Sequence, residues 1–138
     1  MEGDVLITGG AGYIGSVLTK VLLDQGFRVT VYDSLLFDQA SLLDCCHSSS
    51  FRFVQGDISD TEKLAKLLKQ FDIIIPLAAI VGAPACARNP SLARLVNFDA
   101  PIRMLSMVSM EQMVLFPTTN SGYGIGEAEE YCDESSPL

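Results

Sequence analysis

The chain has 138 residues, of which 49% are hydrophobic and 19% are charged, and its formal net charge is −8. This length fits one domain and excludes two full ones, and the apolar content excludes a disordered chain. Five of the 17 acidic residues lie in the last twelve positions, so the acidity is largely a property of the C-terminal segment. No cluster of Lys or Arg is present, which argues against nucleic-acid binding through a basic face.

The mean hydropathy of +0.31 is high for a small soluble domain, and a membrane span could explain it. The longest uncharged apolar run, residues 73–87, has only 15 residues and contains two prolines and a glycine. A span needs roughly 20 apolar residues. The N-terminus is acidic where a signal peptide would be basic. We therefore expect a cytoplasmic protein without a membrane segment, whose hydrophobicity comes from a parallel sheet buried on both faces.

Apolar, β-branched runs predict five strands, at residues 5–7, 29–32, 51–54, 73–75 and 113–116. The segment after the first run predicts a helix that stops at Gly26. Its apolar positions recur at steps of three and four residues: Ile14, Val17, Leu18, Val21 and Leu22. The segment between the second and third runs, residues 34–46, is the weakest helix of the series.

The later connections carry clearer helix signals. Residues 59–62 read S-D-T-E, a capping box that opens a helix with Leu64, Leu67, Leu68 and Phe71 on its apolar face. Asn89 and Pro90 resemble a helix cap followed by proline at the first helical position. That helix could run to about residue 109, with Pro101 kinking or interrupting it. Strict alternation of strands and helices predicts a doubly wound α/β fold, a five-stranded parallel sheet with helices on both faces.

Residues 8–15, TGGAGYIG, follow the first predicted strand and open the first predicted helix. Glycines in this context permit a tight turn and let the backbone approach a pyrophosphate, which the helix N-terminus then attracts. Ser16 stands where a Walker-type phosphate loop would need Lys, so that type of loop is excluded.

Asp33 ends the second predicted strand, 18 residues after Gly15. A carboxylate at this place can accept hydrogen bonds from the adenosine ribose hydroxyls of a dinucleotide. The same charge would repel a 2′-phosphate, and no Lys or Arg lies between Arg28 and Arg52 to offset it. The pattern favours NAD over NADP.

The four cysteines, Cys45, Cys46, Cys86 and Cys132, form no C-x-x-C pair. Cys45, Cys46 and His47 are adjacent, but nothing nearby completes a set of four ligands at usual spacing. We expect reduced thiols and no metal site.

The motifs at residues 8–15, 33, 56–58, 77–79, 97 and 118–124 occur in the order seen in the extended short-chain dehydrogenase/reductases. Within that group the chain resembles the NAD-dependent nucleotide-sugar epimerase/dehydratase family over essentially its whole length. The resemblance implies a Rossmann-type sheet that binds NAD and a nucleotide-sugar substrate. Residues 1–138 would then be an incomplete NAD-binding domain that stops before a sixth strand and lacks the substrate lobe.

The resemblance also implies roles for single residues. The pyrophosphate would lie against Gly9, Gly12, Tyr13, Ile14 and Gly15, and the adenosine ribose against Asp33. The adenine would meet Asp57 and Ile58, the rest of the cofactor would pack along Leu77, Ala78 and Ala79, and Asn97 would lie near the nicotinamide. Thr119 would be the catalytic hydroxyl that holds the sugar oxygen, followed in the substrate site by Asn120 and Ser121. The last two positions resemble an Asp-Glu pair of the dehydratases, and because neither is a carboxylate here, the sequence argues against dehydration.

The family's Tyr-x-x-x-Lys pair is absent, because none of the four tyrosines has a lysine four residues later and no lysine follows Lys69. The simplest interpretation is that the chain stops just ahead of the catalytic helix. We therefore expect the cofactor-binding portion of an epimerase-like oxidoreductase that moves hydride from a sugar carbon to NAD and back, inactive by itself. The alternative is a non-catalytic dinucleotide-binding sensor or regulatory module of the same fold. The unpaired sheet edge also predicts self-association, for example as a homodimer.

Overall fold

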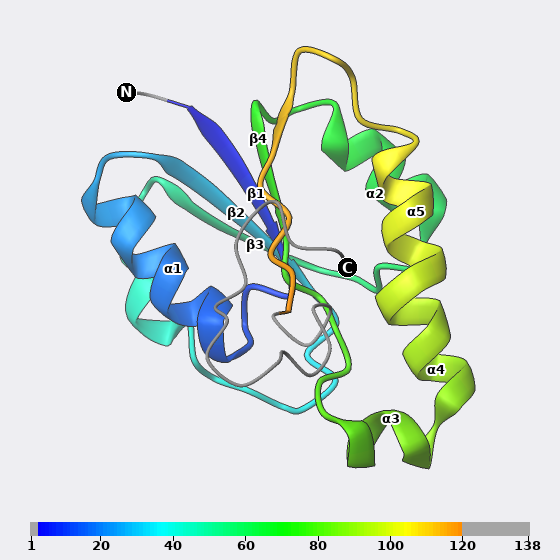
Figure 1. Cartoon of the computed structure of the whole chain (residues 1–138). Helices are drawn as coiled ribbons and strands as arrows, with labels where there is room; N and C mark the ends of the chain where they lie inside the picture. The colour runs from blue at the N-terminus through cyan, green and yellow to red at the C-terminus, as the bar shows by residue number, and fades with distance from the viewer. Residues whose placement is uncertain (1–2, 120–138) are drawn as a thin grey trace, which may run out of the picture.

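A five-stranded parallel sheet forms the centre of the computed structural model, which describes residues 3–119 (Figure 1). The strand order is β3-β2-β1-β4-β5, and every neighbouring pair is parallel. The strands are β1 (Asp4–Thr8), β2 (Arg28–Asp33), β3 (Phe51–Gln55), β4 (Ile73–Pro76) and β5 (Met113–Val114). This confirms the predicted doubly wound sheet, whose strand order reverses between β1 and β4. Sheets of this kind bind ligands at that reversal, outside the carboxyl ends of the strands.

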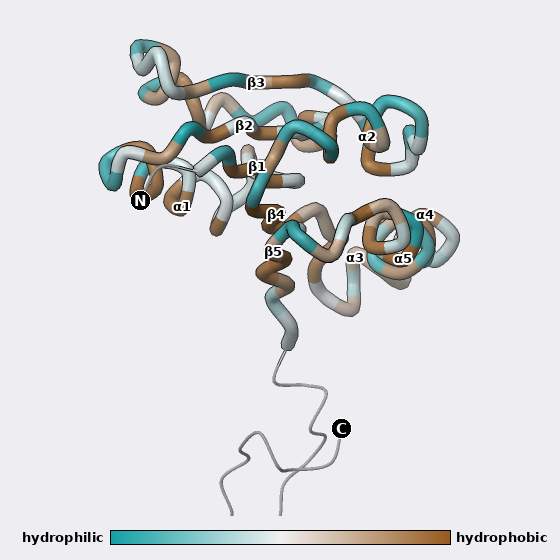
Figure 2. Tube along the Cα trace, turned by 90° about the horizontal axis from the view of Figure 1, so that it is seen from above, coloured by the Kyte–Doolittle hydropathy of each residue, from teal (hydrophilic) through white to brown (hydrophobic). Residues whose placement is uncertain are grey.

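Helices cover both faces of the sheet, as Figures 1 and 2 show, with α1 on one face and α2 and α5 on the other. The helices are α1 (Tyr13–Asp24), α2 (Thr61–Leu68), α3 (Ala83–Arg88), α4 (Pro90–Arg94) and α5 (Ala100–Leu105). A π turn, Leu95–Asp99, joins α4 to α5. None of the helices in residues 3–119 is both long and apolar enough to cross a bilayer.

The central strands are apolar on both faces because each face has its own core. Leu6 of β1 and Ile74 of β4 belong to the cluster under α2 and α5, together with Met104. Their neighbours Ile7 and Ile75 point the other way, into the cluster under α1. Alternate side chains of a strand point to opposite faces, so this arrangement accounts for the high hydropathy.

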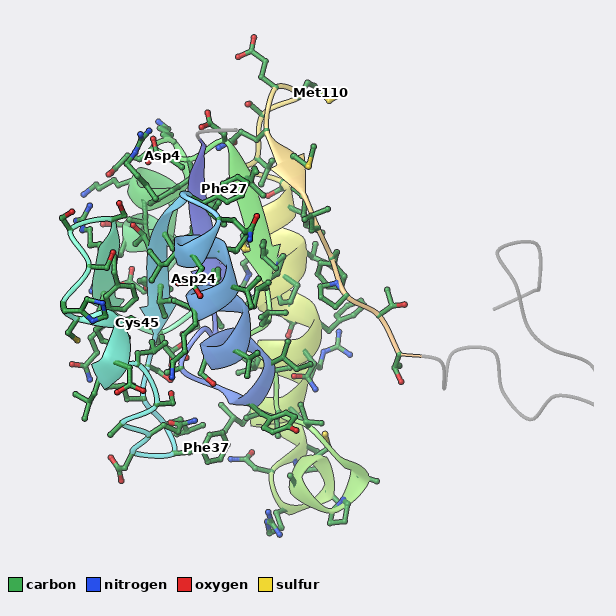
Figure 3. All side chains as sticks on the ribbon, turned by 90° about the vertical axis from the view of Figure 1, so that its left-hand side faces the viewer. Asp4, Asp24, Phe27, Phe37, Cys45 and Met110 are labelled. Atoms are coloured by element: carbon green, nitrogen blue, oxygen red, sulfur yellow. The ribbon has the colours of Figure 1, made fainter. Side chains whose placement is uncertain are left out.

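The connection from β2 to β3 is not the helix that the sequence suggested. Apart from a 3₁₀ turn at Leu43–Cys45 it is irregular. Leu35 and Asp38 have φ angles of +56° and +52°, which an α-helix does not allow. The Leu35 N–H donates to the Asp33 carboxylate, 2.8 Å from N to Oδ1, so the loop bends back immediately after the strand. Figure 3 shows Phe37 of this loop at the opposite end of the molecule from Asp4 and Phe27.

The apolar face predicted for α1 is only partly buried. Leu18 and Leu22 pack against the sheet, and Gly15 and Thr19 are the buried residues of the helix. Three of the predicted positions point outward, at 50–63% exposure: Ile14, Val17 and Val21. The predicted apolar arc was wider than the strip of helix surface that the sheet can cover. Gly26, with φ +87°, follows the end of the helix as predicted.

Two element ends differ from their sequence signals. The cap of α2 is Asp60, whose side chain accepts the Lys63 N–H at 3.0 Å, and not Ser59. Ser59 instead donates its hydroxyl and its N–H to the Asp57 carboxylate. β5 ends at Val114, earlier than predicted, although the Leu115 N–H still donates to the Ile74 carbonyl.

The helix from residue 90 to residue 105 changes geometry ahead of Pro101. Proline lacks the N–H that an α-helix would use for the carbonyl of Asn97, and its ring crowds that carbonyl. The helix forms the π turn Leu95–Asp99 just before this proline, and Pro101 lies buried in α5. The predicted interruption at Pro101 is therefore a local widening that keeps the helix continuous.

Gln112 fastens the turn before β5 to the end of α2. Its Nε2 donates to the carbonyls of Leu68 and Phe71 at 2.7 and 2.6 Å, and its Oε1 accepts the Ser109 N–H at 2.9 Å. Leu68 is the last residue of α2 and Phe71 follows it by three residues, so Gln112 joins both sides of the turn that ends the helix, where the Leu68 carbonyl also accepts the Phe71 N–H at 3.3 Å.

We predict that Gln112→Ala lowers the free energy of unfolding by about 1–3 kcal/mol, because it removes two hydrogen bonds to partly buried carbonyls. Urea denaturation followed by circular dichroism would measure the change. Gln25→Ala, at an exposed position, is the matched control. Equal stability of the two variants would contradict the role given to Gln112.

Candidate functional site

The glycine-rich loop between β1 and α1 is built from contacts that side chains would block. Gly9 has a φ angle of +72°, and a Cβ on it would lie 2.5 Å from the backbone N and Cα of Ala78. A Cβ on Gly15 would lie 2.5 Å from the Cα of Gly10. The loop therefore touches both the segment after β4 and the start of α1 through backbone alone.

The N-terminus of α1 is open to a ligand. Its cap residue, Gly12, offers no side-chain hydrogen bond, and the first turn carries no acidic residue. The N–H groups of a first helical turn have no partners within the helix and carry partial positive charge. Tyr13 and Ile14, at 93% and 63% exposure, border this position. The arrangement suits an anionic group such as a phosphate.

Asp33 is buried at the end of β2 and reaches across to the glycine-rich loop. Its Oδ2 accepts the Ala11 N–H at 2.9 Å and its Oδ1 accepts the Leu35 N–H at 2.8 Å. An ionised carboxylate has about four acceptor positions. Two backbone bonds therefore fix its orientation and leave capacity for two hydroxyl donors.

The end of β3 lies beside Asp33 and is held by Tyr32. The Tyr32 hydroxyl donates to the carbonyl of Asp57 at 2.8 Å, and a Cβ on Gly56 would clash with the ring. Burial, with the Asp60 and Asp57 carboxylates nearby, raises the pKa of Tyr32 to about 12. Ile58 is 8% exposed and packs into the core. Tyr32 therefore positions the backbone of residues 56–58, where the sequence predicts that the adenine binds.

The segment after β4 is aligned by Asn97, which lies in the π turn. The Asn97 Oδ1 accepts the Ile80 N–H at 2.8 Å, and its Nδ2 donates to the Ile80 carbonyl at 2.9 Å. The side chain thus pairs with the N–H and the carbonyl of one residue, as a neighbouring strand would. Leu77 and Ala78 are half-buried ahead of this clamp, and Ala79 is exposed.

The predicted catalytic residue Thr119 is exposed at the end of the described part of the chain. Figures 2 and 3 show that the segment after β5 leaves the sheet at its edge. Asn120 and Ser121 lie outside the described residues. The structure therefore brings together the predicted cofactor residues around the carboxyl edge of β1, β2, β3 and β4. Their roles, like those of the substrate residues, remain predictions.

Sequence reasoning missed three contacts that build this site. They are the hydroxyl of Tyr32 on Asp57, the pairing of Asn97 with Ile80, and the hydroxyl of Ser41, which donates to the Ala11 carbonyl at 2.6 Å. None of them has a local pattern, because each joins residues 17 to 30 positions apart. Among residues 3–119, no group of three His, Cys, Asp or Glu side chains is placed to hold a metal ion.

The family model described as "NAD dependent epimerase/dehydratase family" matches residues 5–138. The chain belongs to this family. It is also similar to solved structures of sugar-nucleotide epimerases. The UDP-glucose-4-epimerase of Stenotrophomonas maltophila, solved with bound NAD and formylated UDP-arabinopyranose, is 28% identical with a TM-score of 0.83. The match covers 99% of this chain and 43% of that one.

Two further epimerase structures give the same picture. The UDP-N-acetylglucosamine 4-epimerase of Methanobrevibacter ruminantium, in complex with UDP-N-acetylmuramic acid, is 26% identical with a TM-score of 0.86, over 99% of this chain and 44% of that one. The Thermus thermophilus UDP-glucose 4-epimerase, in complex with NAD, is 26% identical with a TM-score of 0.83. The match covers 97% of this chain and 43% of that one. The chain spans less than half the length of these relatives.

The residues present in this chain fit the cofactor that the family name implies. The carboxyl edge of the sheet has a glycine-rich loop packed backbone to backbone, a helix terminus free of acidic side chains, and a buried carboxylate with spare acceptor capacity. These are the three features that a dinucleotide needs from a sheet of this kind.

We predict that Gly15→Ala lowers the stability by about 1–3 kcal/mol, because the added methyl group meets the Gly10 backbone and neither side can yield cheaply. Thermal unfolding would measure it. Gly26→Ala is the control, since its Cβ has no atom within 4 Å and only the positive φ is strained. A smaller loss at position 15 than at position 26 would contradict the close packing of the loop.

Tyr32 gives a pH prediction. Its pKa of about 12 in the folded chain lies above the value near 10 of an unfolded tyrosine. The proton is held more tightly in the folded state, so stability is intact below pH 10 and falls as the pH rises to 12. Tyr32→Phe, which has no such proton, should lose less stability across that interval. Urea midpoints of both proteins would be measured at pH 9 and pH 11.5. The difference between the two midpoints should be smaller at pH 11.5, and an equal fall of both midpoints would contradict the prediction.

Proposed function

We propose that residues 1–138 form the NAD-binding Rossmann portion of a nucleotide-sugar epimerase. The observation that carries this proposal is the joint geometry of the glycine-rich loop and Asp33, connected through Ala11. Membership of the epimerase/dehydratase family and the NAD in two of the similar structures support it.

In this proposal each part of the cofactor binds at a different place along the carboxyl edge of the sheet. The pyrophosphate lies on the backbone of Gly9, Gly12 and Gly15 and on the first turn of α1, beside Tyr13 and Ile14. Asp33 accepts the adenosine ribose hydroxyls through the acceptor positions that Ala11 and Leu35 leave unused.

The adenine lies between the end of β2 and residues Asp57 and Ile58. The Asp57 carboxylate already binds Ser59, so its part is to shape the loop as well as to border the base. The nicotinamide half extends along Leu77, Ala78 and Ala79, where Asn97 keeps the backbone in place. When bound, the nicotinamide supplies reversible oxidation and reduction of a sugar carbon.

For the reaction, Thr119 orients the sugar hydroxyl at the carbon that is oxidised, with Asn120 and Ser121 beside the sugar. A positioned hydroxyl assists by holding the reacting oxygen and by aiding proton transfer. Neither Asn120 nor Ser121 can act as a carboxylate acid or base, which favours epimerisation over dehydration. We place the protein in the cytoplasm, with a nucleotide sugar as substrate and a second copy of itself as the partner.

Isothermal titration of the 138-residue chain with NAD and with NADP tests the proposal. We expect NAD to bind more tightly, because Asp33 repels a 2′-phosphate. The double variant Asp33→Ala, Ser34→Arg should reverse that order by removing the negative charge and adding a positive one at an exposed neighbour.

The matched control is Asp24→Ala together with Gln25→Arg, which makes the same charge change at exposed positions at the other end of α1. It should leave the preference for NAD unchanged. Binding of neither dinucleotide to the unchanged chain would refute the proposed function, and an unchanged preference in the Asp33 variant would refute the role of Asp33. With no Tyr-x-x-x-Lys in the sequence, we expect no epimerase turnover from these 138 residues alone.

A further inference from the structure

Ala11 is held in the glycine-rich loop by hydrogen bonds from two other segments of the chain. Its side chain is 2% exposed and packs in the core beneath α1. Its N–H donates to Asp33 at 2.9 Å, and its carbonyl accepts the Ser41 hydroxyl at 2.6 Å. Every polar group of this residue therefore has a partner from outside the loop.

The Ser41 hydroxyl comes from the connection between β2 and β3, 30 positions later in the chain. Its neighbour Leu42 is 7% exposed and Cys45 is 2% exposed, and both belong to the same core as Ala11. An exposed salt bridge of 2.9 Å also joins Lys20 of α1 to Asp44 of the same segment, and the burial of Leu42 and Cys45 contributes more to its position. Ser41 therefore acts from a fixed support, although it lies in an irregular segment.

We propose that Ser41 is a positioning residue for the pyrophosphate of the dinucleotide. The inference rests on the proposed function. The Ala11 carbonyl belongs to the same peptide as the Gly12 N–H, and Gly12 is the cap of α1. The Gly12 N–H donates to the Gly9 carbonyl at 3.1 Å, so this planar peptide is held at its N–H by Gly9 and at its carbonyl by Ser41. Ser41 thus orients the cap of the helix on which the phosphates lie, and it touches no cofactor atom itself.

The two hydrogen bonds on Ala11 act on different parts of the proposed cofactor site, the ribose position and the pyrophosphate position. Asp33 joins the ribose position to the N–H side of Ala11, whereas Ser41 acts on the carbonyl side, toward Gly12. Loss of Ser41 should then weaken ligands that contain the pyrophosphate and leave adenosine alone unaffected. Loss of Asp33 should weaken all of them.

The test is binding of NAD, ADP and adenosine to the 138-residue chain and its variants, by calorimetry for the first two and by NMR shift titration for adenosine. We expect Ser41→Ala to weaken NAD and ADP by about 3- to 10-fold, the effect of one lost hydrogen bond, with adenosine unchanged. Ser41→Thr keeps the hydroxyl and should restore both affinities. Ser49→Ala, at an exposed serine of the same connection, is the matched control and should bind like the unchanged chain.

Equal losses for adenosine and ADP would overturn the inference, because a merely structural role would weaken every ligand. Unchanged ADP and NAD affinities in Ser41→Ala would overturn it too. If Ser41→Ala does not fold, Ser41→Cys, with a weaker donor of similar size, should show the same selective loss. Failure of the unchanged chain to bind NAD or ADP would overturn the proposed function and this inference together.

Discussion

The direct contact of backbone with backbone at the carboxyl edge of β1 is the constraint on which the rest of the structure depends. Gly9 meets the backbone of Ala78, and Gly15 meets that of Gly10. These approaches bring the start of α1 and the segment after β4 within reach of the same ligand. A methyl group at either glycine would separate them, so the site exists only because the two side chains are absent.

The alternation of strands and helices, and with it the doubly wound class of the sheet, could be predicted because apolar periodicity follows directly from burial on a sheet. The glycine-rich loop and Asp33 were predictable for the same reason, since their positions relative to β1 and β2 determine what they can reach. The apolar arc of α1 was less predictable. Periodicity shows which residues share a face, but not how much of that face the sheet will cover, and Val17 and Val21 remain exposed.

Contacts between distant segments could not be predicted from local patterns. The segment from residue 34 to residue 46 gave a weak helical signal, and its true path depends on the hydrogen bonds of Asp33 and Ser41. Asn97 was predicted to lie near the nicotinamide, but its pairing with Ile80 involves the π turn, and Pro101 indicated only that the helix would be kinked or interrupted there. In both segments a side chain makes a hydrogen bond to backbone that a helix or a neighbouring strand would otherwise have made.

The π turn before α5 makes two residues dependent on each other. A π turn is equivalent to one extra residue in the helix, and one residue corresponds to a rotation of 100°. If residue 101 were not proline, the helix could return to α geometry, and Asn97 would turn away from Ile80. Pro101 and Asn97 therefore form one unit for substitution, and changes at either position are tolerated only if the other still allows the segment after β4 to stay in place.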